Sequence, residues 1–143
     1  MPKRLTIDFE EIQMAFEDRD GDGQWFLDRD TGDVIRLTDD EHELAEQVED
    51  SGERYIGIPY QGSEAGYRDM AEFIGSVDDN RLHALLDTAI QGGGAFRRFK
   101  DVLRDYPQER ERWFAFQKQC VHRRIRRWLE SEHIEAVPVQ RAN

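Results

Sequence analysis

WFLDRDTGDVIRL, residues 25–37, is the stretch that decides the predicted fold. Two runs rich in aromatic, aliphatic and β-branched residues flank a polar segment that contains Gly32. Because glycine adopts a positive φ readily, this segment predicts the turn of a β-hairpin. Residues 55–58 form another β-prone run, which ends at Pro59, and we expect this run to pair with the hairpin. The sequence therefore predicts a small antiparallel sheet.

Apolar residues at helical spacing occupy most of the remaining chain. Asp8 with Glu11 predicts the capped start of a helix over residues 8–17, and Thr38 with Glu41 predicts the start of a second helix. Three further helices are predicted around residues 67–74, 79–90 and 96–103. Pro107 begins a long C-terminal helix that runs to about residue 130, and residues 134–139 are compatible with one more strand. The predicted fold class is α+β, a small antiparallel sheet of a hairpin plus one strand, packed with about six helices.

The chain has 143 residues and no linker-like segment, so we expect a single domain over 1–143. Its net charge of −11 is unevenly distributed. The acidic α+β part, residues 1–90, carries 8 Lys and Arg against 24 Asp and Glu, whereas residues 91–143 carry 12 against 7. The latter comprise a basic helical part at 91–131 and a short tail at 132–143. This asymmetry makes the chain a charge dipole, and its basic third is a candidate for contact with an anionic or protein partner.

Several classes of protein are disfavoured by the sequence. No apolar run approaches the length of a membrane span, and Met1–Leu5 lacks the apolar run of a signal peptide, so we expect a cytoplasmic protein that does not bind a membrane. The single Cys120 cannot build a disulfide framework. No HExxH, GxSxG, P-loop or GxGxxG string is present, so we expect no cofactor, assign no catalytic residue and consider an enzyme the less favoured class.

The segment GAFRRFKDVL, residues 94–103, is followed by Tyr106-Pro107 and Trp113. This combination resembles the bacterial group known as uncharacterised protein family 0158. Residues 27–35, 56–59 and 67–74 follow the same pattern in order, so the resemblance spans roughly residues 24–130. It implies a small bacterial protein and directs attention to residues 92–100. It implies no activity, because none is established for the family, and it leaves residues 18–23 outside the matching segments.

The best candidate site is the start of the helix that follows three consecutive glycines. Free N–H groups at a helix start bind anions, and arginine adds a fork of donors suited to phosphate or carboxylate. The candidate anion- or partner-binding residues are Gly93, Gly94, Arg97, Arg98 and Lys100. The glycines equally fit a C-cap and turn after the preceding helix. For Arg97 and Arg98, ion pairs with the chain's own carboxylates are the favoured interpretation. On the binding interpretation the chain is a non-catalytic interaction or regulatory module, whose unknown partner is an anion, another protein or a second copy of itself.

The alternative function is nucleic-acid binding through a basic run in the long helix. The candidate residues are Arg123, Arg124, Arg126 and Arg127. Clustered arginines bind the phosphate backbone. Against this, the isoelectric point is near 4.8, and arginine near a helix C-terminus also stabilises the helix dipole without a ligand.

The third possibility, weak calcium binding, rests on the string DRDGDG at residues 18–23. Asp18, Asp20 and Asp22 match the first acidic positions of an EF-hand loop, with Gly23 at its sixth position. Arg29 occupies the twelfth position, where the loop requires a glutamate, and a predicted strand replaces the exit helix. A solvated Asp/Gly-rich loop is therefore the favoured interpretation of this segment.

Overall fold

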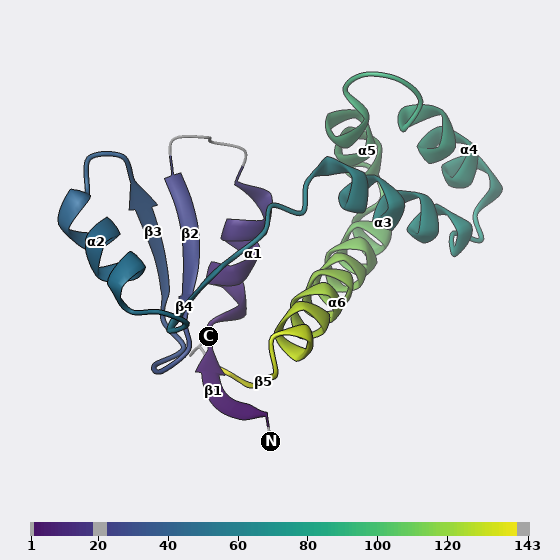
Figure 1. Cartoon of the computed structure of the whole chain (residues 1–143). Helices are drawn as coiled ribbons and strands as arrows, with labels where there is room; N and C mark the ends of the chain where they lie inside the picture. The colour runs from purple at the N-terminus through teal and green to yellow at the C-terminus, as the bar shows by residue number, and fades with distance from the viewer. Residues whose placement is uncertain (1, 19–22, 140–143) are drawn as a thin grey trace. The chain divides into compact units, whose positions relative to one another are not determined.

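Figure 1 shows the computed structural model of the chain, which describes residues 2–18 and 23–139. The chain folds as two compact units. Unit 1 comprises residues 1–62 and 122–143, and unit 2 comprises residues 63–121. The long helix α6, Pro107–Ser131, contributes its first part to unit 2 and its last part to unit 1. The prediction of a single domain over 1–143 stays a prediction. None of the helices described is both long and apolar enough to cross a membrane.

Unit 1 contains the predicted antiparallel sheet. Its three strands are β2 (Gly23–Asp28), β3 (Val34–Thr38) and β4 (Tyr55–Gly57), in the order β3-β2-β4. Phe26 of the central strand lies opposite Ile35 on one side and Gly57 on the other. Gly32 has a φ of 83° in the hairpin turn, as predicted, and a Cβ there would collide with the carbonyl of Thr6. The turn therefore requires glycine for two reasons, its backbone conformation and its close packing.

A second, parallel strand pair joins the two ends of the chain. The strands β1 (Lys3–Ile7) and β5 (Ile134–Pro138) pair with Lys3 opposite Ile134 (Figure 1). The sequence indicated β5 only as compatible with a strand and did not predict β1. In β1 the side chains of Leu5 and Ile7 are buried and alternate with exposed residues. This pattern is too short to predict a strand by itself, and β1 is stabilised by pairing with β5 at the other end of the sequence.

Two helices of unit 1 begin at different kinds of cap. Helix α1 (Phe9–Glu17) begins as predicted, because the Asp8 carboxylate accepts hydrogen bonds from the backbone N–H groups of Glu10 and Glu11. Helix α2 (His42–Asp50) begins later than the predicted capping box. Thr38 instead ends β3, and its N–H and hydroxyl groups both donate to the Glu41 carboxylate. The prediction of a helix start at Thr38 is therefore wrong, because the strand retains this residue.

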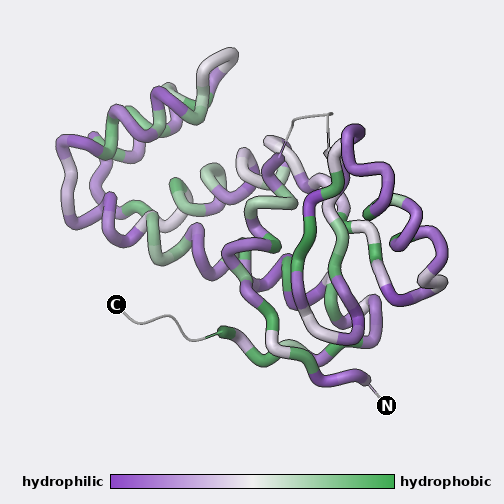
Figure 2. The backbone as a smooth tube through the Cα atoms, turned by 90° about the vertical axis from the view of Figure 1, so that its left-hand side faces the viewer, coloured by the Kyte–Doolittle hydropathy of each residue, from purple (hydrophilic) through white to green (hydrophobic). Residues whose placement is uncertain are grey.

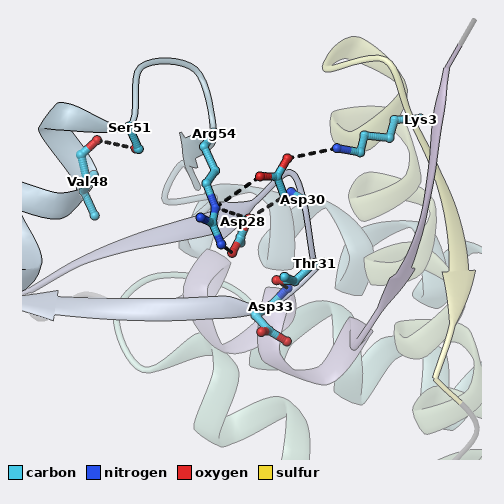
Figure 3. Close-up of polar contacts among 8 residues, drawn as sticks. All are labelled: Lys3, Asp28, Asp30, Thr31, Asp33, Val48, Ser51 and Arg54. Carbon is cyan, nitrogen blue, oxygen red and sulfur yellow. Dashed lines mark hydrogen bonds and ion pairs between the residues drawn. The ribbon is translucent and has the colours of Figure 1, made fainter.

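The turn between β2 and β3 is held by a charge network (Figure 3). The buried Asp28 carboxylate accepts two hydrogen bonds from the Arg54 guanidinium, at 3.0 and 2.9 Å. It also accepts the backbone N–H of Asp30 at 2.8 Å. The Asp30 carboxylate pairs in turn with Lys3 at 3.1 Å. These bonds connect β1, the hairpin turn and the start of β4.

Unit 2 is built from helices alone. They are α3 (Ser63–Gly75), α4 (Asn80–Ala89), α5 (Ala95–Leu103) and the first part of α6. Figure 2 shows apolar and hydrophilic residues alternating along the helices, the amphipathic pattern from which they were predicted. The core is an aromatic cluster in which the ring of Phe73 lies 6.2 Å from Phe99 and 5.3 Å from Trp113, with Phe99 and Trp113 4.7 Å apart. These edge-to-face contacts fix α5 and α6 against α3.

Candidate anion-binding site

The glycines before α5 form a tight turn. Gly92 and Gly94 have φ values of 74° and 76°, in the left-handed region that favours glycine. Gly94 is the N-cap residue of α5 and supplies no side-chain cap. The predicted C-cap and turn role of these glycines therefore accounts for their conformation, while Gly93 is exposed on the same turn.

Arg98 is committed to that turn. Its Nε donates a hydrogen bond to the Ala89 carbonyl at 2.9 Å, and its terminal nitrogens donate to the carbonyls of Gln91 and Gly93. The last carbonyls of a helix lack partners within the helix and carry partial negative charge. The Arg98 guanidinium thus closes the C-terminal end of α4. The hydrogen-bond acceptors of Arg98 are backbone carbonyls. The sequence had suggested carboxylates or an external anion as its partners.

Arg97 and Lys100 do not take part in the hydrogen bonds that Arg98 forms with the glycine turn. Both are exposed, and within residues 2–18 and 23–139 neither forms an ion pair. One cavity in the described part of unit 2 has a lining rich in cations. Of the five residues predicted from the sequence, Lys100 alone lines it.

That cavity lies between α5 and α6 and has a volume of about 320 Å³. We call it the basic cavity, and its lining residues are Lys100, Leu103, Arg104, Arg110, Trp113 and Phe114. Three of these residues are cations and none is an acid. The residues from α5 and its C-cap Arg104, and likewise those from α6, are spaced at positions i, i+3 and i+4, which lie on one helical face. The short turn after Leu103 brings the two faces together.

The two arginines of the basic cavity make different contacts within the chain. Arg104 pairs with the exposed Asp101 on its own helix at 3.0 Å, a contact of small energetic value. The Arg110 guanidinium lies 5.3 Å from the centre of the Phe114 ring, which orients its charge without neutralising it. The lysine and two arginines therefore retain most of their capacity to bind an anion.

Trp113 forms the buried wall of the basic cavity and carries an unusual polar group. The side chain is only 4% exposed, yet its Nε1–H is buried without a hydrogen-bond acceptor in the described structure. Buried N–H groups are nearly always paired, so this donor is an exception among the described residues.

A larger cavity in unit 2 has the opposite charge. Its volume is about 840 Å³, and Asp78, Asp79, Asp105 and Glu109 are among its lining residues. Its one cation, Arg112, is already paired with Glu109 at 2.6 Å and donates to the Ser76 hydroxyl at 2.8 Å. This pairing raises the pKa of Arg112 above its ordinary value. Such a cavity repels anions, so the smaller basic cavity is the better candidate for an anion site.

The arginine run of α6 lies in unit 1. Arg123, Arg126 and Arg127 are exposed, while Arg124 is half-buried. The Arg126 guanidinium lies 5.0 Å from the centre of the Phe9 ring. The spacing of the three exposed arginines places them on one helical face, which we call the arginine face.

The structure describes only part of the aspartate segment. Asp20 and Asp22 lie outside the described residues. The Asp18 carboxylate accepts the Trp25 indole N–H at 2.7 Å and lies 3.5 Å from the Arg36 Nε. The strand predicted after this segment is confirmed as β2, which begins at Gly23.

Sequence reasoning missed Arg110, Trp113 and Phe114 as members of a site. The available signal was their i, i+3, i+4 spacing, which matches that of Lys100, Leu103 and Arg104. The two triplets lie on consecutive helical segments joined by a short turn, and both line the basic cavity.

Comparisons with known proteins agree on one family. A model described as uncharacterised protein family UPF0158 matches residues 2–142. The UPF0158 protein PA5073 of Pseudomonas aeruginosa is 26% identical to the chain over 133 residues, which cover 92% of the chain and 86% of that relative. No solved structure gives a significant match.

Proposed function

We propose that this chain, which belongs to the uncharacterised protein family UPF0158, is a non-catalytic binding module whose basic cavity holds a phosphate-bearing partner. The observation that carries the proposal is the convergence of Lys100, Arg104 and Arg110 on a cavity without a carboxylate lining. Two arginines and a lysine supply the charged groups of the lining, which contains no carboxylate, histidine or cysteine, and this set supports binding of an anion.

The lining suits phosphate for a physical reason. Arginine presents a planar fork of donors that matches two phosphate oxygens, and lysine adds a compact charge. The surroundings are also less unfavourable than the net charge of the whole chain suggests. Unit 2 carries 9 Lys and Arg against 10 Asp and Glu, whereas unit 1 carries 11 against 21. The strong negative field of the chain therefore originates mainly in unit 1.

Calorimetric titration of the full chain with inorganic pyrophosphate tests the proposal. We expect saturable binding that weakens as salt increases. The double variant Lys100→Ala/Arg110→Ala should lose it, whereas Lys118→Ala, which removes an exposed cation of α6 outside the cavity, should not. Absence of wild-type binding at low salt, or equal loss in the Lys118→Ala variant, contradicts the proposal.

A second candidate function, nucleic-acid binding, is favoured by the arginine face of unit 1. Its three arginines, Arg123, Arg126 and Arg127, are exposed and have no ion pair in the described part of the chain. Mobility-shift assays at low salt should then show a complex that is lost in Arg123→Glu/Arg127→Glu and that weakens steeply with salt. If wild-type protein gives no complex at low salt, this candidate is wrong.

A further inference from the structure

The basic cavity has an aromatic side as well as a charged one. Phe114 is 43% exposed, although a large apolar ring is normally buried. It lies beside the buried Leu103 and Trp113 in the cavity lining. The Phe114 ring orients Arg110, and the exposed part of the ring can in addition contact an apolar group of a ligand, which inorganic phosphate lacks. A planar group of the ligand would stack on the Phe114 ring and remove it from water.

The unpaired indole N–H of Trp113 adds a second requirement. This group is a donor only, so a ligand atom that reaches it on binding has to be a hydrogen-bond acceptor. A ligand that leaves the donor unpaired would keep the free-energy cost of a buried polar group without a partner.

We infer that the ligand is a nucleoside monophosphate or a nucleotide unit of that size. Lys100, Arg104 and Arg110 hold the phosphate, the base stacks on Phe114, and an oxygen or nitrogen of the ligand accepts the Trp113 N–H. The volume of about 320 Å³ lies at the lower end of the range for small-molecule sites, which favours a single nucleotide over a dinucleotide. This inference rests on the proposed phosphate binding and specifies the ligand class for the same cavity.

The sharpest test compares AMP with ribose 5-phosphate, because the two probes share the sugar and phosphate and differ in the base. Base stacking on an aromatic side chain corresponds to an affinity gain of roughly 5-fold to 150-fold. We therefore expect AMP to bind at least about 5-fold more tightly. Phe114→Leu should abolish the difference in affinity between AMP and ribose 5-phosphate, whatever its effect on the phosphate contact that the two probes share. Phe96→Leu is the matched control, since Phe96 is 39% exposed on α5 and does not line the cavity.

The indole N–H is tested separately by NMR. The resonance of the Trp113 Nε1–H, identified by its absence in Trp113→Phe, should shift on addition of AMP to wild-type protein. Equal affinities for the two probes, or an unchanged Trp113 resonance at saturating AMP, overturn the nucleotide inference and leave phosphate binding intact. If neither probe nor pyrophosphate binds, the proposed function itself is wrong.

Discussion

Replacement of Asp28 by Asn should destabilise the protein in a manner that depends on pH. In the folded chain the Arg54 guanidinium donates two hydrogen bonds to the Asp28 carboxylate and lowers its pKa from 3.8 to about 2, against the opposing effect of burial. Because the folded-state pKa lies below the unfolded value, the carboxylate contributes stability above about pH 4. That contribution is lost as the pH falls through about 2.

The magnitude follows from the size of the shift. One pKa unit corresponds to about 1.4 kcal/mol, so the full shift of Asp28 corresponds to about 2 kcal/mol. The Arg54 side chain is 41% exposed, and water screens the pair from that side. We therefore expect Asp28→Asn to lower the free energy of unfolding by about 1–2 kcal/mol at pH 7.

Urea denaturation of wild-type and variant protein at a series of pH values measures this difference. The difference should be largest at neutral pH and should shrink towards zero as the pH approaches 2. Asp33→Asn is the matched control, because it removes the same charge from an exposed residue of the same hairpin turn, and it should change stability by less than about 0.5 kcal/mol. A difference for Asp28→Asn that stays constant from pH 7 to pH 2.5 would refute the assigned role of this ion pair.

Three other predictions concern the glycine turn and the aspartate segment. Gly94→Ala should lower stability by about 1–2 kcal/mol in thermal unfolding, because Gly94 has a φ of 76°, whereas Gly93→Ala should have little effect. Arg98→Lys should lower stability by about 1 kcal/mol through loss of the fork of carbonyl hydrogen bonds, and Arg97→Lys should be neutral; equal effects of the two would contradict the capping role of Arg98. Millimolar calcium should leave the melting temperature unchanged, and a rise of several degrees that Asp20→Ala abolishes would show that the segment does bind the ion.

The features predicted correctly from the sequence are those that local chemistry determines. Asp8 caps its helix through neighbouring N–H groups, and Gly32 supplies the positive φ of the hairpin turn. The long C-terminal helix begins at Pro107 as expected, because proline at the first turn loses no hydrogen bond.

The features that the sequence left unpredicted depend on partners far apart in the chain. In strand β1 only Leu5 and Ile7 are buried, and the local periodicity of the sequence gives no indication that this strand pairs with β5. The sequence favoured carboxylates as the partners of Arg98, because acidic residues are numerous in the chain. The fold instead places three backbone carbonyls within hydrogen-bonding distance of its guanidinium. The basic cavity requires both α5 and α6, so no single segment of the sequence reveals it.

Mapping of AMP binding by backbone-amide NMR on the full chain tests the central claim most directly. Chemical-shift changes should concentrate in residues 100–104 and 110–114, the two segments that line the basic cavity. Changes confined to residues 123–127, or no changes at millimolar AMP, would contradict it.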